Sequence, residues 1–447
     1  MKRATATRAR DESPLLVRLA WPIAALFTVA VPLWVSIAGR EAFRLPKLVL
    51  FHTEGILLAA LLIVAALLGR FDSNRRWNLR DPYLTLPLLV LLWTAIVTVL
   101  SPDRRVSSDS LMTVVAGVAI YLVAWERGRS RSLDVAWVVI APALVNAVAV
   151  FVEVRHAWDV RFARAIFGDF SEASLMRVTP FGFMGNRDDL GTLLVPAAIL
   201  AIASALAAVN RRGRLLFGIS ATILVVAIFT TKTLTAIAAL AAAIFILGFI
   251  HSWKSGAAGV LLLLVALPSA FFLHPGLRAR GGDVWRNLQE GRFDQLLVGR
   301  VAPNLAAVGM VRDHPILGVG PGLFGRNYYE YRVEAAQAHP ALVPTSGWID
   351  YFVDAHNDHL QIAAETGVIG YLLFAGALAL GFAISFRRTP GDAKDERFMR
   401  ARLVAAPLFT ALFVLALLQF PMRLAGTLQL LTVCAGLTVG WSRNARD

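Results

Sequence analysis

A succession of long apolar runs constrains the fold of this chain more than any other feature. Many of the runs are roughly 17–25 residues long, enough to cross ~30 Å of hydrocarbon as a helix. Because 57% of the 447 residues are hydrophobic and only 17% are charged, little sequence remains for a large soluble domain. The pattern predicts an all-α polytopic membrane protein, a single domain of residues 1–447 with about twelve transmembrane helices. The predicted spans are 15–38, 47–69, 83–101, 111–125, 135–154, 189–209, 214–231, 233–250, 256–273, 360–386, 403–420 and 424–441.

The distribution of basic residues predicts how these helices are oriented. A net charge of +14 would suggest nucleic acid for a soluble protein, but here the basic residues lie mostly in short loops, so no nucleic-acid partner is expected. The positive-inside rule makes the basic set of loops cytoplasmic, together with both termini. The first apolar run is too long for a signal-peptide core, so it is expected to remain as a helix. The basic groups are those of the N-terminal MKRATATRARDES, Arg70/Arg75/Arg76/Arg80, Arg127/Arg129/Arg131, Arg211/Arg212/Arg214, Lys254, Arg387/Arg388/Lys394/Arg397/Arg400/Arg402, and Arg443 and Arg446.

The opposite, extracytoplasmic side carries a long loop over residues 274–355. It contains eight Arg and eight Asp or Glu, so it is close to neutral. Turns are predicted at Pro315, Gly318–Gly322 and Pro340–Pro344, with short amphipathic helices between them. A smaller polar segment, 155–188, is expected on the same side.

The polar side chains at the end of this loop are the strongest indication of a functional site. The segment AHNDHLQIAAETGVIGYLLF (355–374) leads from His356, Asn357 and Glu365 directly into an apolar helix. Histidine and carboxylate groups entering a bilayer are costly, so they indicate function. Two other interpretations exist: His356 is a polar residue at the interface, or it forms half of a metal site with His359.

Several arginines lie on the predicted extracytoplasmic side, against the positive-inside rule, and a subset of them is a candidate for binding an anionic ligand. For any one of them, headgroup contact or snorkelling is the simpler explanation. Arg300 and Arg187 are the best candidates for anion binding, because a guanidinium forms bidentate hydrogen bonds to phosphate. Arg187 follows Asn186 in a Gly-Asn turn before a span, where free backbone N–H groups can also meet an anion. The departing arginines are Arg40, Arg44, Arg104, Arg105, Arg161, Arg164, Arg177, Arg187 and Arg300.

Two motifs in the late part of the chain resemble the O-antigen ligase / O-antigen polymerase family. The first is RDHPILGVGPGLF (Arg312–Phe324), which matches a basic residue followed by Asp-x-Pro-[Leu/Ile]-x-Gly-x-Gly-x-Gly-x-Phe. The second begins at His356 as HNDHLQIAAETGVIG and matches His-Asn-x-x-Leu-x-x-x-x-Glu-x-Gly-x-x-Gly. The turn FGFMGNRDDLG (Phe181–Gly191) is similar to the family's Gly-Asn turn ahead of a span.

The resemblance implies the polytopic glycosyltransferase fold class, a metal-independent reaction and a glycan donor linked to polyprenyl diphosphate. It implies that His356 engages the acceptor hydroxyl and that Arg300 binds the diphosphate of the donor. One position departs from the family pattern, since the usual Ser-Arg pair of a mid-chain span is Thr233-Leu234 here. Lys232 lies two positions before the missing arginine, and it would offer a point charge without a bidentate fork.

The chemistry argued from the residues needs neither a metal nor a cofactor. Diphosphate is a good leaving group where cations stabilise it, and the sequence contains no Asp-x-Asp triplet that would hold a divalent ion. A histidine can orient or deprotonate the acceptor, with Asp354 or Asn357 fixing its tautomer. Glu365 either touches substrate or holds the loop through an ion pair. The glycines of the first motif are expected to form turns, and Gly367 and Gly370 to allow close helix packing.

Together these expectations describe an inverting glycosyltransferase of the bacterial inner membrane. It would transfer a glycan from undecaprenyl diphosphate to an acceptor hydroxyl on the extracytoplasmic face. The acceptor, a lipid-linked molecule, a glycan repeat or a protein side chain, stays open, and membrane lipids are the remaining partners. The alternatives are a transporter of a small anion or lipid-linked sugar, and an inactive partner in polysaccharide assembly. The sequence shows no internal repeat and its polar residues cluster in one loop, which favours an enzyme over a transporter.

Overall fold

The structure is a computed structural model in which all regular secondary structure of the described residues is helical. The described residues are 15–36, 41–67, 79–129, 134–156, 180–252, 254, 256–257, 261, 275–291, 299–340, 342–343, 351–387 and 395–443.

The long helices confirm the polytopic architecture expected from hydropathy. Within the described residues, nine helices are long and apolar enough to cross a membrane, and two shorter apolar helices accompany them. Eleven of the predicted spans therefore coincide with a helix, whereas 256–273 lies almost entirely outside the described residues. The nine are α2 (Arg44–Leu67), α3 (Pro82–Leu100), α4 (Arg104–Gly128), α5 (Trp137–His156), α8 (Arg187–Ala207), α9 (Arg211–Thr231), α10 (Leu234–His251), α16 (Asp358–Ala383) and α17 (Glu396–Leu418), and the shorter two are α1 (Leu15–Leu33) and α18 (Ala425–Trp441).

Two helices begin a full seven residues before their predicted spans, the largest difference among the described helices. Helix α4 starts at Arg104 rather than 111, and α17 starts at Glu396 rather than 403. The first turns of both are polar, so a hydropathy pattern does not include them. Their starts are fixed by N-cap aspartates, Asp103 and Asp395, whose side chains accept hydrogen bonds from free backbone N–H groups of the first turn.

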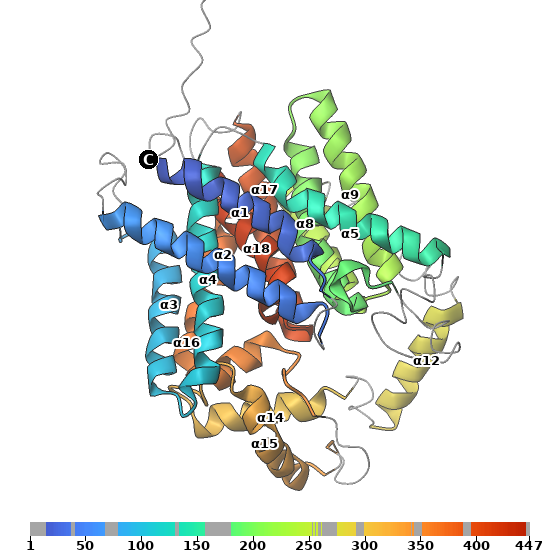
Figure 1. The fold of residues 1–447 in the computed structure, drawn as a ribbon. Coiled ribbons are helices and arrows are strands. Elements are labelled where there is room, and N and C mark those ends of the chain that lie inside the picture. Colours follow the sequence, from blue (N-terminus) through green and yellow to red (C-terminus); the bar gives the residue numbers. More distant parts are fainter. Residues whose placement is uncertain are drawn as a thin grey trace, which may run out of the picture.

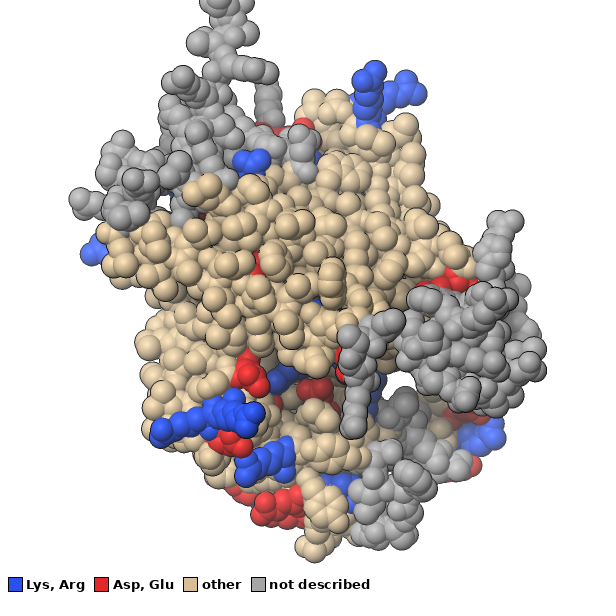
Figure 2. Space-filling view, viewed as in Figure 1, with Lys and Arg blue, Asp and Glu red and all other residues tan. Residues whose placement is uncertain are grey.

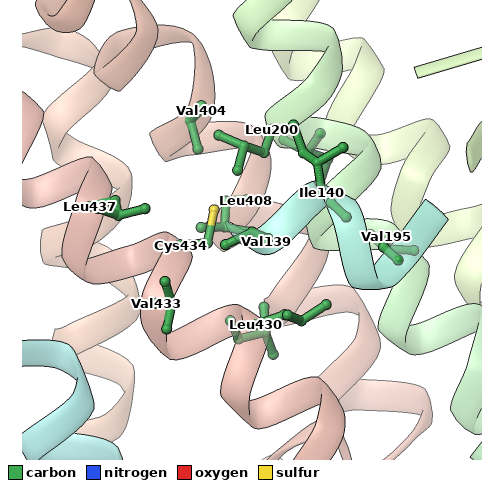
Figure 3. Packing of buried hydrophobic residues seen from close by; sticks show 14 of the residues in the cluster. Val139, Ile140, Val195, Leu200, Val404, Leu408, Leu430, Val433, Cys434 and Leu437 are labelled. Carbon is green, nitrogen blue, oxygen red and sulfur yellow. The ribbon is translucent and has the colours of Figure 1, made fainter. Parts of the chain in front are cut away.

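Helix α8 forms the centre of the bundle and is buried along most of its length. Figure 3 shows Val195 and Leu200 of α8 among buried side chains of α5, α17 and α18, including Cys434. The sequence of α8 is rich in alanine, which leaves room for neighbouring helices to approach closely.

Glycines bring α18 close to α4. A Cβ on Gly440 would lie 2.3 Å from the carbonyl oxygen of Trp125 and 2.7 Å from Cα of Gly128. A Cβ on Gly436 would lie 2.6 Å from the carbonyl oxygen of Tyr121. Backbone-to-backbone packing of this kind is typical of small residues in membrane helices.

Three helices form the segment between α10 and α16: α12 (Pro275–Gln289), α14 (Val301–Asp313) and α15 (Phe324–Ala338). Figure 1 shows α14 and α15 below the ends of α3, α4 and α16. We call the end that carries α14 and α15 the loop end. Phe324 and Tyr328 of α15 pack with Met310 of α14 in a small separate core. The expected short helices of the loop are therefore present.

Candidate functional site

His356 is held at the loop end by two aromatic rings and one backbone carbonyl. Its ring meets Phe352 and Phe420 edge to face, with centroid distances of 5.6 and 4.7 Å. Nδ1 lies 3.1 Å from the carbonyl oxygen of Asp354. Because a carbonyl oxygen only accepts hydrogen bonds, this contact assigns the proton to Nδ1 and leaves the Nε2 lone pair free.

The environment keeps the His356 imidazole neutral. Burial is the largest cause and lowers its pKa below the usual 6.5, and the positive charges of Arg300 and Arg44 lower it further. The Asp354 carbonyl and carboxylate oppose this shift only in part. The side chain is half-buried, so Nε2 belongs to a sheltered but accessible ring.

The backbone at His356 is also unusual. Its φ is +55°, in the left-handed region that side chains other than glycine rarely adopt. The next residue, Asn357, caps α16 by accepting a hydrogen bond from the Leu360 N–H at 3.1 Å. The chain therefore turns sharply at His356 and enters the helix at once. The side-chain oxygen of Asn357 is therefore engaged in capping α16.

A buried amide anchors the residues that precede His356. Gln361 accepts a hydrogen bond from the Ala355 N–H at 2.9 Å through Oε1. Its Nε2 donates to Asp354 Oδ1 at 3.2 Å and to Glu365 Oε1 at 3.1 Å. One side chain on the first turn of α16 thus fixes the carbonyl that orients the histidine.

Glu365 is occupied by protein groups. Its Oε2 accepts a hydrogen bond from the Gly322 N–H at 2.8 Å and pairs with Arg423, while Oε1 accepts from Gln361. Burial would lower the pKa of Arg423, but the carboxylates of Glu365 and Asp354 outweigh it and raise the pKa. Of the two expectations for Glu365, the geometry matches the ion pair that holds the loop.

The glycines of the first motif form a tight backbone connection to α16. Gly318, Gly320 and Gly322 all have positive φ, as the turn interpretation requires. The Val319 N–H donates to the Ala364 carbonyl at 2.8 Å, the Gly320 N–H donates to the Glu365 carbonyl at 3.1 Å, and the Val368 N–H donates to the Pro315 carbonyl at 2.8 Å. The two sequence motifs are therefore joined through main-chain atoms, and no phosphate cradle is needed to explain the glycines.

Gly367 is the centre of this connection rather than a helix-packing residue. It interrupts α16 with φ 70° and ψ 179°, and a Cβ there would lie 1.9 Å from the carbonyl oxygen of Ile316. The expectation of close helix packing was wrong for Gly367 because its neighbour is loop backbone. At Gly370, a Cβ would meet Thr366 of its own helix at 2.0 Å and Trp93 of α3 at 3.2 Å.

Arg300 lies at the N-terminal end of α14 and donates a hydrogen bond to only one described residue. Nη1 donates a hydrogen bond of 2.6 Å to the carbonyl oxygen of Leu418, and the guanidinium forms no ion pair with any carboxylate of the described residues. Burial lowers its pKa, and Asp188 partly opposes the shift. Since a guanidinium remains charged at any physiological pH, Arg300 offers an unpaired cation.

The Gly-Asn turn lies next to the start of α8, but its asparagine is used locally. Asn186 accepts a hydrogen bond from the Asp188 N–H at 2.8 Å and so caps α8. The Arg187 side chain is partly exposed and lies 3.8 Å from Asp188. The hydroxyl of Thr233 donates to the Arg187 carbonyl at 3.0 Å, which joins the α9–α10 turn to the same region.

Lys232 occupies that turn with φ 57° and an exposed side chain. Its ammonium group makes no hydrogen bond or ion pair with any described residue. Its backbone N–H closes the end of α9 on the Phe229 carbonyl at 3.1 Å. The lysine is thus a free cation near the start of α8, without a contact to His356 or Arg300.

Four residues that the sequence did not single out as a group complete the site: Arg44, Asp189, Phe420 and Arg423. Arg44 forms a bidentate pair with Asp189, with distances of 2.9 and 3.2 Å. Its guanidinium carbon lies 5.2 Å from the centre of the Phe420 ring, which also contacts His356. The only advance signal was Arg44 itself, an arginine at the loop end of a span.

These contacts gather charge between the helix bundle and the loop helices. Figure 2 shows the molecule hollowed there, with acidic and basic side chains inside the hollow. Arg44 and Asp189 come from bundle helices, whereas Asp354 and His356 come from the end of the loop. We call this hollow and its charged residues the cleft.

His359 faces away from the cleft. Its ring packs against Tyr371, Phe374 and Phe413, and Nε2 lies 3.2 Å from the Phe413 carbonyl oxygen. It therefore does not join His356. In the described part of the chain, no three His, Cys, Asp or Glu side chains converge as ligands of one metal ion.

Comparison with known families agrees with the two motifs. Residues 219–375 match the family model described as O-antigen ligase. We refer to these matched residues, 219–375, as the O-antigen ligase domain. This domain includes Lys232, Arg300, His356 and the whole connection between the glycine motif and α16.

The O-antigen ligase domain does not contain the whole cleft. Arg44 and Asp189 precede it, and Phe420 and Arg423 follow it. No curated protein matches this chain. The cleft is thus built from the O-antigen ligase domain and from helices on both sides of it.

Proposed function

We propose that the protein is an inverting, metal-independent glycosyltransferase. It transfers a glycan from an undecaprenyl-diphosphate carrier to an acceptor hydroxyl on the extracytoplasmic face of the bacterial inner membrane. The O-antigen ligase domain supports a role in glycan transfer during polysaccharide assembly. The identity of the lipid carrier, the membrane face on which transfer occurs and the roles of individual residues are our proposal.

One observation supports this proposal best: a neutral histidine with a free Nε2 lies close enough to Arg300 to feel its charge, and Arg300 pairs with no carboxylate of the described residues. The Asp354 carbonyl fixes the His356 tautomer, and the lowered pKa keeps the imidazole in its basic form. Within the described residues, Arg300 donates a hydrogen bond only to the Leu418 carbonyl. Glycosyl transfer requires these two groups, a proton acceptor and a cation for the leaving group.

In the proposed reaction, His356 acts on the acceptor. Nε2 accepts the proton of the acceptor hydroxyl as its oxygen attacks the anomeric carbon of the donor sugar. The bond between that carbon and the diphosphate oxygen breaks, and the diphosphate leaves with the electron pair. A single displacement inverts the anomeric configuration. The proton then passes from the imidazolium to solvent, which restores the basic form.

Arg300 acts on the leaving group. A planar guanidinium can donate two parallel hydrogen bonds to a phosphoryl group, and these strengthen as negative charge accumulates. The carbonyl of Leu418 takes one donor and orients the rest. Asn357, Asn186 and Glu365, whose polar groups are used by caps and an ion pair, are proposed to position the cleft rather than to bind the glycan.

The most direct test is a deletion strain that is complemented with the intact gene. Loss of polymer-capped lipopolysaccharide, with lipid-linked polymer retained, would identify a ligase, whereas single-repeat caps would identify a polymerase. Loss of glycan from proteins would identify protein transfer. Unchanged glycans on all three acceptors would contradict the proposed function.

A reconstituted reaction makes the test chemical. The purified protein in proteoliposomes should release undecaprenyl diphosphate from a lipid-linked glycan only when an acceptor is present. The released lipid and the new glycosidic bond should appear in equal amounts. Movement of the intact lipid-linked sugar across the membrane without release would instead indicate a transporter.

A further inference from the structure

Arg44 is a second guanidinium of the cleft that the mechanism above leaves unused. It is the first residue of α2, and its Nε and Nη2 donate to Asp189 Oδ2 and Oδ1 at 2.9 and 3.2 Å. The two partners differ in exposure, since the Asp189 side chain is 2% exposed and that of Arg44 is 47% exposed. One edge of the guanidinium thus faces protein, and the remainder is open.

The open part of Arg44 retains donors. A guanidinium has five N–H groups, and Asp189 takes two of them through one edge. Nη1 donates to no described residue, so both of its hydrogens remain. This arrangement holds the arginine from one side and leaves its other edge available.

The position of Arg44 relates it to both proposed catalytic groups. Its guanidinium lies over the Phe420 ring at 5.2 Å, and the same ring contacts His356. Two residues earlier, the Leu418 carbonyl accepts the hydrogen bond from Arg300. The short connection between α17 and α18 therefore holds both arginines and the histidine.

We propose that Arg44 is a second phosphate-binding residue, so that Arg300 and Arg44 each contact one phosphoryl group of a lipid-linked diphosphate. Asp189 is then a positioning residue that fixes the plane of the Arg44 guanidinium. This inference rests on the proposed function, because it names the ligand of the same cleft. It differs from the sequence-based expectation, in which Lys232 is the second cation.

The test compares two lipids that differ by one phosphoryl group. Farnesyl diphosphate and farnesyl monophosphate are titrated against the full-length protein in detergent. The wild type should prefer the diphosphate by a factor on the order of 10 to 100, since each hydrogen bond to a charged group contributes that much. Arg44→Lys keeps the charge without the fork, so it should lose part of this preference.

A charge-matched variant separates binding from folding. Arg44→Gln alone leaves Asp189 buried without its partner, so Arg44→Gln/Asp189→Asn removes both charges together. We expect this double variant to fold and to bind both lipids with similar affinity. Asp189→Asn alone should keep a preference for the diphosphate. Arg286→Gln, which removes an exposed arginine of α12, serves as the control and should behave as wild type.

Each result decides between defined alternatives. If the folded double variant keeps the full wild-type preference for the diphosphate, then Arg44 does not bind phosphate. If the double variant does not fold, Arg44→Lys takes its place and decides in the same way. If Lys232→Ala abolishes the preference and the Arg44 variants do not, the second cation is Lys232. If the wild type binds neither lipid, the proposed function itself fails. If only the Arg44 variants behave as wild type while Arg300→Ala loses affinity, this inference alone is wrong.

Discussion

The imidazole of His356 meets the ring of Phe420 edge to face, with the two centroids 4.7 Å apart. Phe420 belongs to the connection between α17 and α18, and His356 belongs to the end of the loop before α16. The contact joins the O-antigen ligase domain to a segment outside it. The proposed base is therefore oriented by two distant parts of the chain.

Replacing His356 should abolish transfer without affecting folding. Loss of a positioned general base costs about 10²–10⁴-fold in rate. His356→Ala should show this loss in the reconstituted reaction, with normal abundance in the membrane and normal affinity for farnesyl diphosphate. His339→Ala removes an exposed histidine that directly follows α15 and is the matched control. Wild-type transfer by a normally expressed His356→Ala variant would refute the catalytic role.

Replacing Arg300 should affect the donor instead of the acceptor. Loss of one charge contact to the leaving group costs about 10²–10³-fold in rate. Arg300→Ala should lose both transfer and farnesyl diphosphate affinity, and Arg300→Lys should recover only part of the rate because it lacks the bidentate geometry. An Arg300→Lys variant with the full wild-type rate would show that charge alone is sufficient.

The rate should fall on acidification. His356 acts in its neutral form, so the rate is constant above its pKa and decreases below it. Because burial, Arg300 and Arg44 lower this pKa, the midpoint should lie below 6.5. Arg44→Gln removes one cation and should move the midpoint to higher pH, whereas Arg286→Gln should not. A rate that is unchanged from about pH 8 to about pH 5 would exclude a titrating base of this kind.

Transfer should survive removal of divalent ions. Under the proposed mechanism, arginines stabilise the leaving diphosphate, so EDTA should leave the rate of the reconstituted reaction within a factor of about two. A rate that collapses in EDTA and returns with Mg²⁺ or Mn²⁺ would contradict this assignment of roles.

Gly367→Ala should destabilise the protein strongly. The φ/ψ values of Gly367 are almost exclusive to glycine and cost about 1–3 kcal/mol for another residue, and the new Cβ would also collide with the Ile316 carbonyl. Gly376→Ala in the same helix is the control, since its Cβ would meet only Leu86 methyl groups at 3.6 Å or more. Thermal unfolding in detergent should separate the two variants. Equal melting temperatures would show that α16 can straighten.

Reporter fusions should test the orientation that the basic loops predict. Alkaline phosphatase fused near residue 330, in α15, should be active, and a fusion near residue 393 should be inactive. Equal signals from both positions would contradict the predicted topology and the location of the reaction.

The sequence was sufficient for the membrane architecture because each span is encoded locally. An apolar run of helical length identifies a helix such as α8 or α9 without reference to any other part of the chain. The largest differences are the polar first turns of α4 and α17, which are marked by caps rather than by hydropathy. His356 and Arg300 could also be predicted, because the resemblance to the family rests on short stretches of consecutive residues.

The remainder of the cleft depends on contacts between distant residues, which no local pattern contains. Arg44 meets Asp189 across 145 positions, and Arg423 meets Glu365 across 58. A paired arginine and an unpaired one look identical in a sequence. Gly367 was misassigned for the same reason, since its spacing from Gly370 suits helix packing, whereas its neighbour is the backbone of a loop that precedes it.

The connection from Leu418 to Arg423 has a consequence for the cleft. Its six residues hold Arg300 through a carbonyl, His356 through a ring, Asp358 through the Met422 N–H and Glu365 through a guanidinium. Because all four groups contact the same six residues, a backbone change anywhere in this connection would reach the proposed base, the proposed cation and the start of α16 at once.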